Sequence, residues 1–280
     1  MAVAVAVSVI APAAGTAMAA PAAGTGLHTL AAQKKGFVKK SGKWYYYKKG
    51  KKVSGLNRIS GHYYYFSKSG VMQSGKKTID GLTWYFKKAK DGKAAALADR
   101  EMKISGKKWY FSSTGKGFLS TGNKTGNQAV AKLIDGLKLK NSMNKKAKLQ
   151  AAYQYILDHY EYMPADLPNL KNKNWIYSKA MEMVTEEVGK CYEYTAITAL
   201  AAKALDYKVT VYTGRYKMNA SAKDYTEHSW VVVDGKNILD SVRDDNNGKK
   251  GMQYFCRTAA QILDSEGTDY DYKTAKKFSI

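Results

Sequence analysis

Cysteine and histidine are both scarce in this 280-residue sequence. The two cysteines, Cys191 and Cys256, exclude a framework of several disulfides and leave one possible disulfide, between each other. The four histidines are His28, His62, His159 and His228. A zinc site could use Cys191 and His228, but no further ligand stands at a recognisable spacing. We therefore expect no bound metal and no cofactor.

Long apolar runs are also missing, because no stretch has the roughly 20 unbroken apolar residues that span a bilayer. The first 20 residues, MAVAVAVSVIAPAAGTAMAA, come closest, but Pro12 and Gly15 interrupt them. The pattern Ala17-Met18-Ala19 that follows is typical of the end of a secretory signal peptide. A membrane anchor is the alternative. We expect a secreted protein with no membrane span, in which residues 1–32 form a signal peptide and a short linker.

Acidic residues are few, 23 against 46 lysines and arginines, which gives a net charge of +23. Most of this excess lies between residues 33 and 127, where 23 basic residues face 4 acidic ones. Outside the cell, a basic module meets surface polymers rather than nucleic acid, so we expect a cell-wall polyanion and no nucleic-acid partner. A basic surface that is merely solvated explains the charge equally well, because lysine gives no geometric specificity.

The basic module contains a repeated aromatic motif. Each copy has a glycine, two variable residues and three aromatic residues: GKWYYY from Gly42, GHYYYF from Gly61, GLTWYF from Gly81 and GKKWYF from Gly106. A further glycine follows each triplet, at Gly50, Gly70, Gly92 and Gly115. An aromatic strand followed by a glycine turn predicts a β-hairpin, and a lone hairpin is only marginally stable. We therefore expect residues 33–127 to form an all-β, solenoid-like array of stacked hairpins.

Stacked hairpins divide the aromatic side chains into two sets. Alternate residues of a strand point to opposite faces, so some rings pack between neighbouring hairpins while others stay available to a ligand. The aromatic residues that we expect to bind a ligand are Trp44, Tyr45, Tyr46, Tyr64, Tyr65, Trp84, Tyr85, Trp109 and Tyr110. The alternative is that all of these rings only stack on one another.

The repeat unit resembles the choline- or glucan-binding cell-wall repeats of Gram-positive surface proteins, most closely over residues 36–122. In the choline-binding type, aromatic residues of adjacent hairpins enclose a quaternary ammonium group. Here Phe37 replaces the tryptophan that usually stands early in the unit, and the third copy carries the insert KKAKDGKAAALADREMK. Dense lysines repel choline and suit an anionic polymer. The resemblance therefore implies attachment to a wall polymer, teichoic acid or glycan.

Helical periodicity replaces the aromatic repeat after residue 127. The stretches AVAKLIDGLKL, KKAKLQAAYQYILDHY and WIYSKAMEMVTEEV have apolar residues three and four apart. Residues 192–205 are apolar or small on most faces, which predicts a buried helix. The β-type runs KVTVYTG, HSWVVVDG and KNILDSV follow, the last two joined by Asp234-Gly235. We expect residues 128–280 to form an α+β domain.

Cys191, His228 and Asp240 are the candidate catalytic residues. Cys191 stands at the start of the predicted buried helix, where unpaired N–H groups and the helix dipole favour a thiolate. Because Asp234-Gly235 closes a hairpin, we expect His228 and Asp240 to lie opposite each other. His228 could then take the thiol proton while Asp240 holds the other imidazole nitrogen.

These segments resemble the transglutaminase-like superfamily, papain-like cysteine enzymes in which a cysteine begins a central helix and histidine and aspartate lie on adjacent strands. The similar pieces are GKCYEYTAITALAAKAL, KVTVYTG and HSWVVVDGKNILDSV, within residues 145–245, and Trp230 fits the family's His-x-Trp pattern. The resemblance implies a Cys191–His228–Asp240 triad that acts on a protein or peptide substrate.

Together these patterns predict a secreted, wall-attached cysteine enzyme that acts on amide bonds through a thioester. Hydrolysis of the thioester, in a protease or amidase, is favoured by analogy with bacterial members of the superfamily. Transfer to a lysine amine, in a cross-linking transglutaminase, is the alternative. A second alternative is a non-catalytic wall-binding scaffold, and a disulfide between Cys191 and Cys256 would need no active site.

Overall fold

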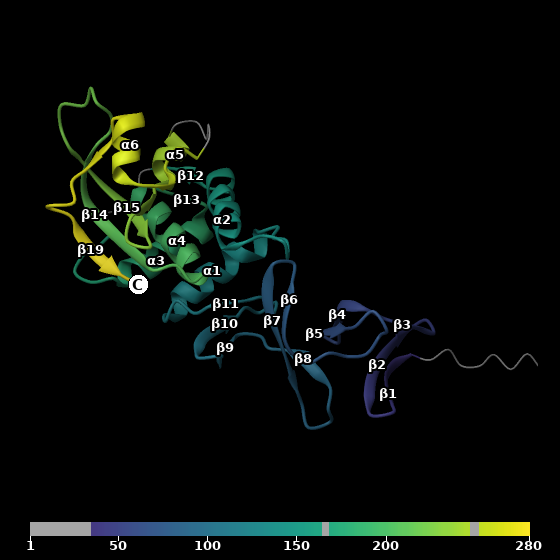
Figure 1. The fold of residues 1–280 in the computed structure, drawn as a ribbon. Helices are drawn as coiled ribbons and strands as arrows, with labels where there is room; N and C mark the ends of the chain where they lie inside the picture. Colours follow the sequence, from purple (N-terminus) through teal and green to yellow (C-terminus); the bar gives the residue numbers. More distant parts are fainter. Residues whose placement is uncertain (1–34, 164–167, 247–251) are drawn as a thin grey trace, which may run out of the picture.

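The computed structural model describes residues 35–163, 168–246 and 252–280. The predicted signal peptide and linker, residues 1–32, lie outside the described residues. An array of β-hairpins is followed by a larger body of helices packed on a sheet (Figure 1). This order confirms the predicted fold class, a hairpin array followed by an α+β domain. No helix in the described ranges is long and apolar enough to cross a membrane.

The N-terminal part is built from short antiparallel strands. These are β1 (Gly36–Lys40), β2 (Lys43–Lys48), β3 (Lys51–Lys52), β4 (Gly55–Ile59), β5 (His62–Phe66), β6 (Gly75–Ile79), β7 (Leu82–Lys88), β8 (Ala94–Ala96), β9 (Arg100–Ile104), β10 (Lys107–Phe111) and β11 (Gly117–Leu119). Pairing joins β1, β2 and β3, then β4 and β5, then β6, β7, β11, β10 and β9 in that order, with β8 beside β7. Each aromatic triplet lies on the second strand of a hairpin, on β2, β5, β7 or β10.

A two-residue turn precedes each aromatic triplet. Ser41-Gly42 joins β1 to β2, and both residues have positive φ angles, 48° and 72°, as type I′ hairpin turns require. The same geometry recurs at Ser60-Gly61, Asp80-Gly81 and Ser105-Gly106. The glycines that follow the triplets, where a turn was predicted, also have positive φ angles and turn the chain toward the next strand. Each repeat therefore uses two turns, and its leading glycine closes the hairpin.

The two faces of each aromatic strand have different roles, as the alternation predicts. The third aromatic residue is buried in the last three copies, at Phe66, Phe86 and Phe111. Rings from neighbouring hairpins pack together, with Phe37 and Tyr64 at 5.0 Å and Tyr63 and Trp84 at 5.5 Å between ring centroids. These contacts join successive hairpins into one array.

The C-terminal part combines helices with a mainly antiparallel sheet. Its helices are α1 (Lys124–Gly136), α2 (Lys145–His159), α3 (Asn174–Glu186), α4 (Cys191–Ala204), α5 (Ser241–Asn246) and α6 (Ala259–Glu266). Its strands are β12 (Glu161–Tyr162), β13 (Val188–Gly189), β14 (Val209–Lys217), β15 (Thr226–Val233), β16 (Asn237–Leu239), β17 (Phe255–Arg257), β18 (Asp269–Tyr270) and β19 (Lys276–Ser279). The main sheet has the order β17-β16-β15-β14-β18, and β19 also pairs with β14.

Helix α4 lies at the centre of this part. Of its 14 residues, 13 are buried, because small and apolar side chains occupy all of its faces. It packs against α1, α2 and α3 on one side and against β14 and β15 on the other. The predicted buried helix is therefore present, and its first residue is Cys191.

The last hairpin packs directly on the helices. Phe118 of β11 belongs to the same apolar cluster as α1 and α4. The side-chain oxygen of Asn127 accepts a hydrogen bond from the Thr121 N–H at 2.8 Å, and its amide donates to Glu101 at 3.1 Å. Helix α1 begins at Lys124, so the boundary expected after residue 127 falls inside this helix. The two parts share a core at this junction.

We predict that Phe118→Ala destabilises the helical part by about 3–5 kcal/mol, because a buried ring leaves a cavity when it is truncated. Hydrogen-exchange mass spectrometry of peptides from α1 and α4 would measure the loss of protection. Phe66→Ala is the matched control, since Phe66 is buried in a cluster confined to the hairpins, and it should leave exchange in α4 unchanged. Equal protection of α4 in both variants would contradict a shared core.

Candidate functional site

The start of α4 places Cys191 at the edge of the core. Gly189 of β13 leads into the helix, and an added Cβ there would lie 2.5 Å from Glu193, so only glycine fits. The Glu193 carboxylate accepts a hydrogen bond from the Lys190 N–H at 3.0 Å and so closes the first turn. Cys191, with 8% exposure, is the first helical residue. The first N–H groups of a helix have no partner within the helix, so they point toward the space around this thiol.

His228 and Asp240 meet beneath Cys191. His228 lies on β15, and its Nε2 is 2.7 Å from Oδ2 of Asp240. The turn between β15 and β16 spans residues 234–236, one residue more than predicted. Leu239, the last residue of β16, pairs with Val231, so Asp240 lies between β16 and α5 and not, as was predicted, opposite His228 in the strand pairing. The two side chains still reach each other across the sheet. The Tyr270 hydroxyl donates to the same Asp240 oxygen at 2.7 Å and fixes the carboxylate.

The surroundings of His228 favour its charged form. Burial alone would lower the pKa of this imidazole, which is 2% exposed, but the Asp240 carboxylate and a hydrogen bond with Cys191 raise the pKa to about 9. Because Nε2 is engaged by Asp240, Nδ1 is the nitrogen that can exchange a proton with the Cys191 sulfur. The Tyr216 ring stacks on the imidazole, with centroids 4.2 Å apart, and limits its rotation.

Hydrogen bonds from two hydroxyl groups join β15, which carries His228, to α4, which carries Cys191. Ser229 Oγ donates to the Cys191 carbonyl at 2.8 Å, and Thr195 Oγ1 donates to the Ser229 carbonyl at 2.8 Å. Both side chains are buried. Sequence reasoning missed this pair, although Thr195 stands four residues after Cys191, on the same helical face, and Ser229 follows His228. The pair sets the separation between Cys191 and His228.

Other supporting residues had no local sequence signal. Tyr270 reaches Asp240 from 30 residues farther along the chain. Glu193 is buried and pairs with Lys179 Nζ at 2.8 Å. The Lys179–Glu193 pair ties α3 to the start of α4, and Lys179 also contacts Glu182 within α3 at 2.6 Å.

The surface beside Cys191 offers room for a substrate. A cavity of about 430 Å³ is lined by residues that include Tyr192, Gly214 and Glu227, which adjoin Cys191 and His228 in the chain or in the sheet. On another side, Tyr162 and Met163 are 44% and 48% exposed, and the Met163 N–H donates to the Gly189 carbonyl at 2.8 Å. Exposed apolar side chains therefore stand next to the helix start that carries the thiol.

Cys191 and Cys256 are both free thiols in the structure. Cys256 lies on β17, half-buried against the main apolar cluster, and burial raises the pKa of its thiol. Within the described ranges, no group of three or more His, Cys, Asp or Glu side chains is arranged to hold a metal ion. The observed geometry thus pairs Cys191 with His228 rather than with the second cysteine.

The aromatic residues expected to bind a ligand occupy different environments. Tyr64 and Trp84 are buried between hairpins, whereas the other seven are half-buried. Lysines of the chain cover several exposed faces: Lys52 Nζ lies 4.4 Å from the Tyr45 ring centre and Lys76 Nζ 4.7 Å from that of Trp109. Their role in binding stays a prediction.

The insert in the third repeat reaches back to the first hairpin. Lys93 Nζ lies 5.3 Å from the Phe37 ring centre and 4.8 Å from that of Trp44. Trp44 Nε1 donates to the Asp91 carbonyl at 3.2 Å, which anchors the insert there. A cation of the chain therefore already occupies the position between these two rings.

We predict that the protonated His228 stabilises the fold in a pH-dependent way. Its pKa is about 9 in the folded state and about 6.5 in an unfolded chain, so its contribution is complete below pH 6.5 and is lost as the pH rises through 9. The loss should be on the order of 3 kcal/mol. Denaturant unfolding from pH 6 to 10 would measure it.

Two variants make this comparison specific. His228→Gln should flatten the pH dependence, and His62→Gln, at an exposed histidine, should leave it as in the parent protein. A His228→Gln protein with the parent's pH profile would contradict the assignment.

Part of the chain matches a known protein family. Residues 133–237 match the model of the transglutaminase-like superfamily, a range that includes Cys191 and His228. No curated protein matches the chain. Similar solved structures are CbpJ from Streptococcus pneumoniae, at 22% identity over 30% of this chain and 28% of that chain (TM-score 0.26), and choline binding protein F from the same species, at 26% identity over 30% and 27% (TM-score 0.26).

A third similar structure is a truncated alternansucrase from Leuconostoc mesenteroides, at 24% identity over 30% of this chain and 7% of that chain, with a TM-score of 0.26. The chain thus spans less than a third of each of these three proteins. Choline binding protein F is thus among the structures similar to this chain, and residues 133–237 of the C-terminal part match the transglutaminase-like superfamily model.

Proposed function

We propose that the protein is a secreted, wall-attached cysteine enzyme that acts on amide bonds through a thioester on Cys191. The observation that carries this proposal is the 2.7 Å contact between His228 and Asp240, at the helix start that bears the thiol. The match of residues 133–237 to the transglutaminase-like superfamily supports it.

Cys191, His228 and Asp240 each have one role in thioester formation. The Cys191 sulfur attacks the amide carbonyl carbon, and negative charge develops on the carbonyl oxygen, where N–H groups at the start of α4 can stabilise it. His228, protonated at Nδ1, gives its proton to the departing amine nitrogen as the C–N bond breaks. Asp240 accepts from Nε2 throughout and keeps the imidazole oriented.

When the thioester is broken down, a proton moves in the opposite direction, onto His228. Neutral His228 takes a proton from the incoming nucleophile, which attacks the thioester carbonyl, and the Cys191 sulfur leaves with its electron pair. Water gives a carboxylic acid, as in a protease or amidase. A lysine amine gives a new amide, as in a cross-linking transglutaminase. Hydrolysis remains the favoured outcome by analogy with bacterial peptidases of this superfamily.

The hairpin module fits an anionic wall polymer better than choline. The module carries 23 basic and 4 acidic residues between positions 33 and 127. Lys93 already lies between Phe37 and Trp44, and Lys52 covers Tyr45, so a quaternary ammonium group would have to displace these cations. A polyanion meets no such competition, since ammonium groups over the rings attract it.

We predict that Cys191→Ala and His228→Ala abolish turnover of a peptide library, with rates lower by roughly 10⁴-fold or more. Asp240→Asn should keep partial activity, because the imidazole is then misoriented rather than absent. Mass spectrometry with and without monodansylcadaverine would separate cleaved or deamidated products from amine adducts.

Cys256→Ala is the matched control and should retain full activity. The intact protein should also react with iodoacetamide at pH 6 at Cys191 well before Cys256. Full activity in the Cys191→Ala protein would rule out the nucleophile, and absence of any Cys191-dependent product in the whole library would favour a binding scaffold.

We also predict that the Cys191→Ala protein sediments with Gram-positive cell walls and is released as salt rises above about 0.1 M, where exposed charges are screened within about 10 Å. Binding should fall when teichoic acid is extracted from the walls. Free choline at low salt should not release the protein. Release by choline, with no effect of salt, would favour choline recognition over attachment to a polyanion.

A further inference from the structure

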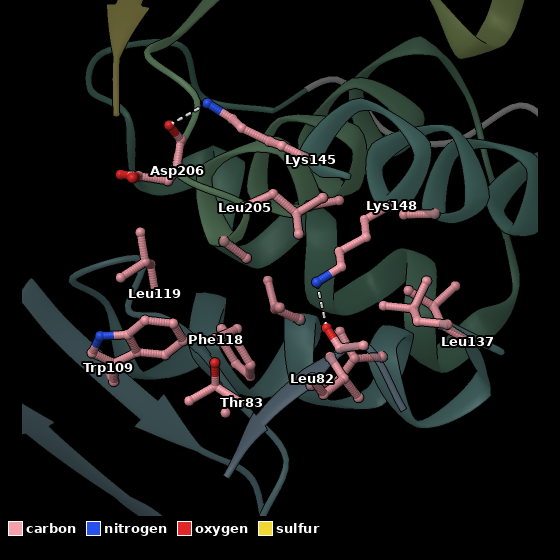
Figure 2. A pocket seen from close by; sticks show the side chains of 18 of the residues that line it. Leu82, Thr83, Trp109, Phe118, Leu119, Leu137, Lys145, Lys148, Leu205 and Asp206 are labelled. Carbon is pink, nitrogen blue, oxygen red and sulfur yellow. Dashed lines mark hydrogen bonds between the residues drawn. The ribbon is translucent and has the colours of Figure 1, made fainter. Parts of the chain in front are cut away.

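A separate cavity of about 500 Å³ lies where the last hairpins meet the helices (Figure 2). Most of its wall is apolar. The hairpin side contributes Leu82, Trp109, Phe118 and Leu119, and the helical side contributes Val130, Leu133, Ile134, Leu137 and Leu205. A cavity of this size is in the range that binds small organic ligands in proteins.

Small side chains on two packed helices create the space. Ala152 of α2 and Ala201 and Ala204 of α4 face the cavity, where longer side chains would fill it. All three are buried, so this part of the wall belongs to the core of the helical part. The cavity therefore has a rigid helical wall on one side and the last hairpins on the other.

The polar residues of the cavity are mostly cationic. Of the described residues that line it, four are lysines and one is acidic: Lys76, Lys107, Lys145, Lys148 and Asp206. Lys107 forms an ion pair with Asp206. With one carboxylate against four ammonium groups, the polar part of the wall carries a net positive charge.

Two of these lysines donate to neutral acceptors. Lys148 Nζ donates to the Gly81 carbonyl at 2.6 Å, and Lys145 Nζ donates to the Asp206 backbone carbonyl at 2.7 Å. Figure 2 shows Lys148 extending from its helix toward Leu82, across the apolar interior. Each ammonium has three N–H donors, so further donors remain for a ligand.

Lys148 has the environment of an anion-binding group. Its side chain is half-buried beside apolar residues, and an ammonium group in such a place is stabilised when a negative charge pairs with it. A backbone carbonyl satisfies one donor but leaves the net charge in place. An anionic head group at Lys148 would provide the missing negative charge.

We propose that this cavity binds a single-chain amphiphile with an anionic head, whose alkyl chain fills the apolar interior and whose head contacts Lys148. Lysine acts as a point charge without a preferred planar geometry, so a carboxylate and a phosphate monoester both fit the chemistry. The proposal does not depend on Cys191, because none of the candidate catalytic residues lines this cavity.

Isothermal titration calorimetry of the full chain with dodecanoate and with dodecyl phosphate tests the proposal. Both should bind at low salt. Acetate, which has the head without the chain, and dodecyltrimethylammonium, which has the chain with a cationic head, should not. The melting temperature should rise with the concentration of each binding amphiphile, since a ligand of the native state stabilises it.

Three variants identify the site. Lys148→Gln keeps a donor for the Gly81 carbonyl but removes the charge, and it should weaken dodecanoate binding by about tenfold or more. Lys146→Gln removes the same charge from the same helix outside the cavity, and it should bind almost as the parent does. Leu119→Trp should fill the cavity and abolish binding in a protein whose melt stays cooperative.

The outcomes are distinct. Equal binding of dodecanoate and dodecyltrimethylammonium would show nonspecific apolar adsorption and overturn the proposal. Equal weakening by Lys148→Gln and Lys146→Gln would place binding on the general basic surface instead. Failure of all amphiphiles to bind would also overturn it, while leaving the Cys191 chemistry untouched.

Discussion

The burial of α4 on every side is the constraint on which the other parts of the structure depend. The helix passes between α1, α2 and α3 and the sheet formed by β14 and β15, and only Lys203 among its residues is not buried. A helix held in this way fixes the positions of both of its ends. Cys191 stands at one end, facing His228, and Ala204 at the other end lines the cavity beside the last hairpin.

The helical part and the hairpin part of the chain differ in where their charged side chains lie. The helical part buries two ion pairs, His228 with Asp240 and Glu193 with Lys179, and pairing matters there because an unpaired charge in a core is strongly destabilising. The hairpin part leaves ammonium groups at the surface or over aromatic rings, as with Lys93 on Trp44. Buried pairs hold their side chains in a fixed geometry, which catalysis requires. Exposed cations can attract an anionic polymer without any fixed geometry of contact.

The sequence predicted those features that depend on local patterns. The start of α4 at Cys191 followed from a change in residue type, and the meeting of His228 with Asp240 followed from the hairpin between them, even though the turn is one residue longer than expected. Tyr270 and Glu193 could not be assigned, because their partners are set by long-range packing of β18 on Asp240 and of α3 on α4. The contact of Lys93 with the Phe37 ring could not be predicted either, because it depends on the path of the insert in three dimensions.

The length of α4 separates the two sites that it connects. With 14 residues and a rise of about 1.5 Å per residue, its ends are roughly 20 Å apart, too far for a bound anion in the cavity to act on Cys191 strongly through the field at physiological salt. Any effect of an amphiphile on Cys191 chemistry would therefore have to be carried by movement of the helix. Because closely packed cores resist small displacements, Leu119→Trp and Cys191→Ala should act independently, each on its own site.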